Sequence, residues 1–276
     1  MLQQMLDFLS WYFWASPSIL GWSLAIIFGA IWLACYRPPM TIKLWLWGIR
    51  VNNPWLWVVL VGGAVMAPIA IVIVSFPMSY GISKLLGYYL SRDAVQTWNW
   101  LLSIPSIFIF GLVWEGAKLV PVAIYWWRKN RDLDPKSGLL VGAVAGAGFG
   151  IMVTQWANNL FISNTNWNWQ FVQVQGFPAF SGFWESFFIL GLNVASTALA
   201  GWGLAKGWGW KFYLIACGVY FVTNYNTVLL SRELISATQV EFLIAAWALI
   251  VVGVTLWLRD RQSETFKKKH SPRRKK

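Results

Sequence analysis

Long apolar stretches alternate along the chain with short polar segments. A helix of about 20 apolar residues crosses a bilayer, and seven stretches come close to that length: Pro17–Tyr36, Pro54–Ser75, Trp100–Trp127, Leu139–Ile162, Phe183–Ala205, Phe212–Leu230 and Val240–Leu258. They lack the period-two alternation of barrel strands, and a helix satisfies its backbone polar groups internally. The pattern therefore predicts an all-α polytopic transmembrane bundle of about seven spans, with residues 1–258 as a single membrane domain.

Composition agrees with a membrane protein. Of 276 residues, 58% are hydrophobic and 12% are charged, about half the charged share of roughly 25% in soluble domains. The two cysteines, Cys35 and Cys217, lie inside apolar stretches, which indicates small packed residues rather than a disulfide framework or metal ligands. The first residues lack the basic segment of a signal peptide, so we expect no cleavage. Met5–Trp14 mixes aromatic and polar residues as a short interfacial helix does.

The basic residues predict the orientation of the spans, because cytoplasmic loops carry the excess of Lys and Arg. Eighteen of the 22 fall in alternate loops and the C-terminal tail: Arg37, Lys43, Arg50; Arg128, Lys129, Arg131, Lys136; Lys206, Lys211; and nine from Arg259 onward. The opposite side has Lys84, Arg92 and Arg232. We therefore expect the N-terminus outside and the C-terminus in the cytoplasm. As a separate expectation, the location is a bacterial inner (plasma) membrane.

The C-terminal tail, residues 259–276, contributes much of the net charge of +12, and we expect it to be disordered. Its position beside a span favours contact with anionic lipid, where each basic residue gains about 1 kcal/mol. The contact residues would be Lys267, Lys268, Lys269, Arg273, Arg274, Lys275 and Lys276. The alternative is that the tail binds an RNA or an acidic partner. Because its position favours lipid, we expect no nucleic-acid partner.

The external segment Ser163–Gly182 has no charged residue but several Trp and Phe side chains. We expect it to lie on the membrane surface, and the alternation over Trp167–Phe171 suggests a short strand or hairpin. With 22 Trp in the chain, aromatic belts at the two interfaces are the simpler interpretation, and a contact with a ligand or pigment is the other.

Candidate chemistry inside the membrane begins with Glu115 and Lys118. They are three residues apart in the third predicted helix and share one face of it. Intramembrane charges are costly unless they are paired, so the pair marks either a functional site or a structural ion pair that orients the bundle.

Small and amide residues cluster in the following helices. Gly142, Gly146, Gly148 and Gly150 permit close helix packing, and Gln155, Asn158, Asn193 and Asn224 bring amides toward mid-membrane. Together with Glu115 and Lys118 these amides suggest an internal polar site. Hydrogen bonds that hold the helices together are the competing interpretation.

Residues Leu112 to Gly203 resemble the PrsW-type intramembrane proteases, within the CAAX-protease-like group. Trp114-Glu115-Gly116-Ala117-Lys118 stands where that family has Glu-Glu-x-x-Lys. Two further segments are similar to the family's sequences: the basic loop Arg128–Gly138 and the Gly-rich run Gly142–Gly150. The resemblance implies a fold of this type and a site at the level of Glu115.

The departures from the family fall on the residues that the resemblance assigns to catalysis. Trp114 replaces the first Glu of Glu-Glu-x-x-Lys, whereas Glu115 and Lys118 are kept. The Glu of a Glu-Asn pair, which follows the Gly-rich run in the family, falls on Val153, or on Gln155 with two residues inserted. The two family His residues fall on Asn193 and on Tyr220 or Val222. The chain's one histidine is His270, so a site of two His plus carboxylates cannot form.

We therefore expect a non-catalytic PrsW-like membrane protein that binds a transmembrane segment, lipid or pigment, without a cofactor or metal and within a complex of membrane proteins. An active protease that uses Glu115 and a structural subunit of a larger, for example energy-transducing, complex are the alternatives. A Ser–Lys dyad of Lys118 with Ser103 or Ser106 is less favoured, because those serines lie more than three turns away on the same helix.

Overall fold

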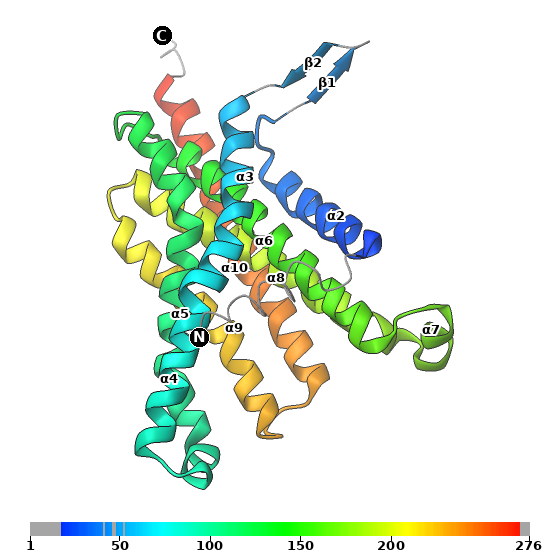
Figure 1. Ribbon diagram of the computed structural model, residues 1–276. Helices are drawn as coiled ribbons and strands as arrows, with labels where there is room; N and C mark the ends of the chain where they lie inside the picture. The colour runs from blue at the N-terminus through cyan, green and yellow to red at the C-terminus, as the bar shows by residue number, and fades with distance from the viewer. Residues whose placement is uncertain (1–17, 41, 46–47, 52, 271–276) are drawn as a thin grey trace.

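The structure is a computed structural model that describes residues 18–40, 42–45, 48–51 and 53–270. The expected interfacial helix at Met5–Trp14 and the basic residues Arg273–Lys276 lie outside these ranges. Within these ranges, seven helices are long and apolar enough to cross a membrane, which confirms the all-α, seven-span prediction (Figure 1).

The elements follow one another as α2 (Ile19–Tyr36), β1 (Ile42–Trp45), β2 (Gly48–Val51), α3 (Pro54–Ile69), the π-helix η1 (Ala70–Ser75), α4 (Phe76–Tyr89), α5 (Arg92–Arg128), α6 (Pro135–Thr165), α7 (Trp169–Gln175), the 3₁₀ helix η2 (Phe177–Phe180), α8 (Ser181–Ala205), α9 (Gly209–Ser231) and α10 (Ala237–His270). Strands β1 and β2 pair antiparallel, with Ile42 opposite Val51. This small hairpin in the first loop was not predicted.

The second and third spans are longer than the apolar stretches predicted. Helices α3, η1 and α4 form one rod of 36 residues, and α5 has 37, so each is about 55 Å long at 1.5 Å per residue. A hydrocarbon core is roughly 30 Å thick. Helix α4 and the start of α5 therefore extend the bundle at one end (Figure 1).

The expectation of a strand at Trp167–Phe171 is wrong, because the segment forms α7. The Asn168 side chain caps this helix by accepting a hydrogen bond from the Phe171 N–H, at 2.9 Å, and a cap of this kind favours a helix start over a strand. The C-terminal tail also differs from expectation, since α10 continues past Leu258 as far as His270.

Helices α6 and α8 form the packed centre of the bundle. In their most apolar 18-residue windows, 78% of α6 and 83% of α8 are buried. A Cβ placed on Gly146 would lie 2.3 Å from the Asn193 carbonyl oxygen of α8, and one on Gly148 would meet the Leu60 carbonyl of α3. Glycine at these two positions allows the backbones to approach this closely.

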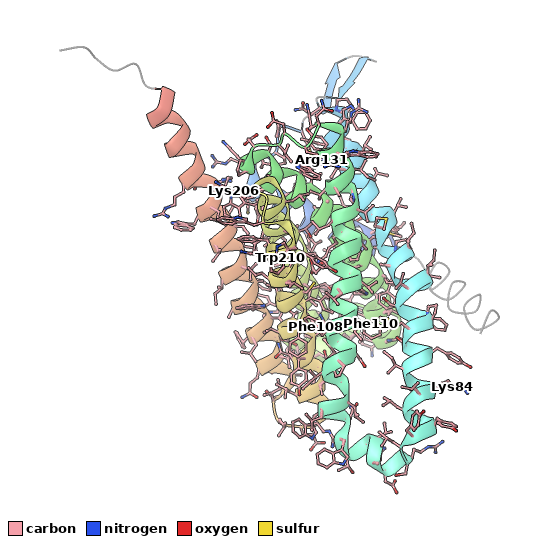
Figure 2. All side chains as sticks on the ribbon, turned by 90° about the vertical axis from the view of Figure 1, so that its left-hand side faces the viewer. Lys84, Phe108, Phe110, Arg131, Lys206 and Trp210 are labelled. Atoms are coloured by element: carbon pink, nitrogen blue, oxygen red, sulfur yellow. The ribbon has the colours of Figure 1, made fainter. Side chains whose placement is uncertain are left out.

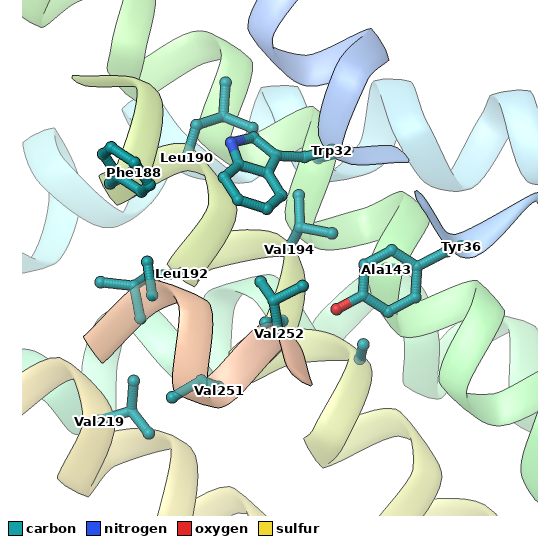
Figure 3. Close-up of a cluster of buried hydrophobic side chains, with 14 of the residues drawn as sticks. Trp32, Tyr36, Ala143, Phe188, Leu190, Leu192, Val194, Val219, Val251 and Val252 are labelled. Atoms are coloured by element: carbon teal, nitrogen blue, oxygen red, sulfur yellow. The ribbon is translucent and has the colours of Figure 1, made fainter. Parts of the chain in front are cut away.

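A hydrophobic cluster surrounds this centre. Trp32 and Tyr36 of α2, Leu190 and Val194 of α8 and Val252 of α10 pack into it (Figure 3). The cluster holds the first and last spans against α6 and α8.

The basic loops gather at one end of the bundle. Figure 2 places Arg131 and Lys206 at that end and Lys84 at the other, and Figure 1 shows the β-hairpin and the last turns of α10 at the same end as the basic loops. This is the arrangement that the loop-by-loop charge pattern predicts for seven spans.

Candidate functional site

The predicted ion pair lies inside the bundle. Glu115 and Lys118 project from one face of α5, with 2% and 1% of their surfaces exposed, and Lys118 Nζ is 2.5 Å from Glu115 Oε1. Charges so fully removed from water are destabilising unless their remaining donors and acceptors are also satisfied.

Helix α8 supplies the remaining partners. Lys118 Nζ donates to Asn193 Oδ1 at 3.0 Å and to Ser196 Oγ at 3.2 Å, and Ser196 in turn donates to the Glu115 carboxylate at 3.3 Å. The Asn193 Nδ2 group donates to the Ile189 carbonyl at 3.0 Å. An ammonium has three protons to donate, and Lys118 has three acceptors. The network is therefore closed.

A cavity of about 150 Å³ adjoins this network. Glu115, Asn193 and Ser196 contribute polar groups to its lining, and Trp114, Val153 and Tyr220 also line it. The Trp114 ring stacks edge-on against Phe149, with centroids 5.6 Å apart, and its Nε1 donates to Ser75 Oγ at 3.0 Å. The lining residues thus come from α5, α6, α8 and α9, and the hydrogen bond to Ser75 in the π-helix η1 orients the Trp114 ring.

A second, larger cleft of about 450 Å³ lies between α4, α5 and α9. Hydroxyl and amide side chains line much of it: Ser79, Ser83, Asn99, Ser103, Ser106 and Thr227. Tyr220 and Asn224 line both spaces. The cleft and the cavity are therefore neighbours that meet at these two residues.

The structure brings together four of the six residues predicted for the polar site: Glu115, Lys118, Asn193 and Asn224. Gln155 and Asn158 are buried but are not part of the cavity lining. The Asn158 Nδ2 group instead donates to the Gly21 carbonyl of α2, at 3.4 Å. Helix geometry explains the separation, since Gln155 is two residues from Val153 and so faces the other side of α6.

Two further residues were missed or misassigned from the sequence. Ser196 is the serine that contacts Lys118, whereas Ser103 and Ser106, the serines considered for a dyad, line the outer cleft. The i, i+3 spacing of Asn193 and Ser196 was the available signal, since it places both on one face of α8. Tyr220 was identified only as a replaced position.

Among the residues that the structure describes, no group of three or more His, Cys, Asp or Glu side chains could hold a metal ion. Comparisons with protein-family models, with curated proteins and with solved structures find no match for the chain.

Proposed function

We propose that this integral membrane protein is a non-catalytic, PrsW-like binding protein whose cavity receives a polar group of a membrane-embedded ligand: a transmembrane segment, a lipid or a pigment. It would act within a larger membrane complex. The hydroxyl and amide lining of the outer cleft provides a polar route from the end of the bundle toward Glu115.

One observation carries the proposal. The resemblance marks Trp114, Val153, Asn193 and Tyr220 as positions where family residues are replaced, and all four line the cavity beside Glu115. They come from four different helices and are far apart in the sequence. Of the alternative positions, Gln155 does not line the cavity and Val222 is 46% exposed.

The closed hydrogen-bond network favours binding over chemistry. Lys118 donates to Glu115, Asn193 and Ser196 at the same time. Water attack on an amide needs a free base, oxyanion stabilisation and protonation of the leaving group. Groups that already satisfy one another are poorly placed to supply all three.

Cavity filling tests the binding role. Thr223→Trp places a large side chain in the cavity lining, whereas Val222→Trp changes the neighbouring, exposed position of the same helix. After purification in mild detergent, mass spectrometry should detect the bound ligand in the wild type and in Val222→Trp, and at least tenfold less in Thr223→Trp. Equal retention in both variants would place the ligand outside the cavity.

A gain of metal binding tests the resemblance separately. Trp114→Glu, Val153→Glu, Asn193→His and Tyr220→His together would place two His and two new carboxylates around one cavity, a ligand set that suits zinc. The combined variant should bind about one zinc per chain by metal analysis, provided that it elutes as a folded species. A matched variant with Val222→His in place of Tyr220→His should bind far less. Stoichiometric zinc in the unmodified protein would contradict the proposal.

A second candidate is a hydrolase in which Ser196 is the nucleophile and Lys118 the base. The observation that favours it is the 3.2 Å distance between Lys118 Nζ and Ser196 Oγ, which is the spacing of an activated serine. A base must accept the proton of the nucleophile, however, whereas here Lys118 donates to Ser196 and also to Glu115 and Asn193. Cleavage of a reporter transmembrane segment that is lost in Ser196→Ala would establish this activity instead.

We also propose that the basic end faces the cytoplasm of a bacterial inner membrane. In a background with Cys35→Ala and Cys217→Ala, a cysteine that replaces Ser163 should react with an impermeant thiol reagent from outside the cell. A cysteine that replaces Asn130, in the basic loop, should react only after the membrane is opened. The reverse pattern would invert the orientation.

A further inference from the structure

A second site lies at the basic end of the bundle, where α3 and α5 are neighbours. Of the described residues that line it, none also lines the polar cavity around Glu115. It consists of a cationic pocket at the helix ends and an apolar groove that runs from there toward mid-membrane.

The cationic pocket has a volume of about 290 Å³. Arg128 and Lys129 at the end of α5, Tyr125 one turn earlier, Asn53 and Ser137 provide charged and hydrogen-bonding groups around it. None of the described residues that line this pocket is acidic. The nearby Asp134 caps α6 by accepting from the Lys136 and Ser137 N–H groups, at 3.0 and 3.1 Å. The pocket thus presents two positive charges to an incoming anion.

The groove below it has a volume of about 520 Å³ and almost entirely apolar walls. Val58, Val61 and Val65 of α3 face Val120 and Ile124 of α5 across it. From Trp57 to Met66 it is about 14 Å long at 1.5 Å per residue, which is half of the roughly 30 Å core of a bilayer. It therefore spans the depth of one leaflet.

Pocket and groove are joined by a cation–π pair. The Arg128 guanidinium lies 3.5 Å from the centre of the Trp55 ring. Arg128 follows Val120 and Ile124 at four-residue spacing, so all three lie along one face of α5. Trp55 precedes Val58 by three residues on the facing side of α3. Arg128 and Trp55 consequently stand where the charged end of the site meets its apolar part.

From this arrangement we infer that α3 and α5 form a binding site for an anionic phospholipid. The lipid phosphate binds Arg128 and Lys129, and one acyl chain lies in the groove between Val61 and Ile124. Charge complementarity selects the occupant, because basic pockets between transmembrane helices bind anionic head groups, and only an amphiphile also fills an apolar groove of one-leaflet depth. The site is independent of the binding role proposed for the polar cavity.

Lipid titration of the purified full-length protein, followed by native mass spectrometry, tests the charged half of the site. Dioleoyl phosphatidylglycerol should bind more tightly than dioleoyl phosphatidylcholine. Arg128→Gln or Lys129→Gln should each weaken phosphatidylglycerol binding about fivefold, since one basic residue near a membrane surface contributes about 1 kcal/mol. Lys211→Gln removes the same charge at the same end, outside the pocket, and should have little effect.

Filling the groove tests the apolar half. Val61 is 59% exposed, so Val61→Trp should leave the fold intact, verified by an unchanged elution profile, and weaken binding of both lipids. Ile26→Trp, at an exposed position of α2, is the matched control and should weaken neither. Excess inorganic phosphate should not displace phosphatidylglycerol.

Several outcomes would overturn the lipid site. Equal affinity for the two lipids, or equal loss in Lys211→Gln and Arg128→Gln, would mean that only diffuse surface charge acts. Displacement by phosphate, with no effect of Val61→Trp, would mean a simple anion pocket. A dimer that dissociates in Val61→Trp would mean that a second copy of the chain occupies the groove.

Discussion

The pair α6 and α8 contrasts with the pair α5 and α9. Both pairs carry polar residues at membrane depth, yet in their most apolar windows 78% and 83% of the first pair are buried, against 33% and 17% of the second. Glycine and alanine bring α6 and α8 together at backbone distance, whereas the large side chains of Trp114 on α5 and Tyr220 on α9 border the cavity. Residue size, more than polarity, separates the scaffold from the candidate site.

Asn193 belongs to both regions. Its backbone carbonyl faces Gly146 within the close α6–α8 contact, and its side chain accepts the hydrogen bond from Lys118. The tightly packed pair thereby fixes one wall of the cavity. This connection explains how the less buried side of the bundle can present polar groups at defined positions.

The largest expected effect comes from breaking the ion pair at the border between the two regions. Lys118→Met leaves Glu115 buried without its cation, a change that costs about 3–5 kcal/mol for buried pairs. The free energy of unfolding in detergent should fall by that amount. Lys84→Met, which removes an exposed lysine of α4, should have almost no effect.

The double variant sharpens this prediction. Glu115→Gln combined with Lys118→Met removes both charges, so most of the lost stability should return. If the double variant is as unstable as Lys118→Met, Lys118 contributes through packing rather than through charge compensation.

The next effect compares two glycines. In Gly146→Leu the new side chain meets the α8 backbone at Asn193, and overpacking of this kind costs about 1–3 kcal/mol or more. Gly218→Leu on α9 introduces the same side chain where a Cβ has no neighbour within 4 Å. Thermal unfolding should therefore shift to lower temperature for Gly146→Leu alone. An equal shift in both variants would remove the distinction between the two helix pairs.

The sequence predicts the spans well because length and apolar character are properties of each segment by itself. The features that the sequence did not predict depend on properties other than apolar length. Alternation at Trp167–Phe171 suggested a strand, but the Asn168 cap starts a helix there. The helical extension of α4 and α5 has many polar residues, so hydropathy alone does not detect it.

The candidate site was predicted in part, for a similar reason. The i, i+3 spacing places Glu115 beside Lys118 without any knowledge of the fold. The contacts of Asn158 with α2 and of Ser196 with Lys118 depend on how each helix is rotated about its axis relative to its neighbours. Polar residues occur all around α6 and α8, so the sequence does not specify these rotations. The resemblance gave two pairs of alternative positions, Val153 or Gln155 and Tyr220 or Val222, and the first member of each pair lines the cavity.

The smallest effect is expected from removing single tyrosine hydroxyls. One of the two compared, Tyr36, lies in the packed core, and the other, Tyr225, lies on α9. Tyr36 is 1% exposed, and its hydroxyl is 2.6 Å from Thr255 Oγ1, which itself donates to the Val252 carbonyl. The half-buried Tyr225 donates to the Trp100 carbonyl at 2.9 Å, and this hydrogen bond is exposed.

Tyr36→Phe should lower the free energy of unfolding by about 1 kcal/mol, because a buried acceptor loses its donor where water cannot replace it. Tyr225→Phe should change it by much less, since water can satisfy the Trp100 carbonyl. Adding Thr255→Val to Tyr36→Phe also removes the Thr255 hydroxyl that has lost its donor, so part of the lost unfolding free energy should be regained. Equal losses of unfolding free energy in the two single variants would show that water reaches Tyr36 and Thr255. The core around α6 and α8 would then be as accessible to water as the contact between Tyr225 and Trp100.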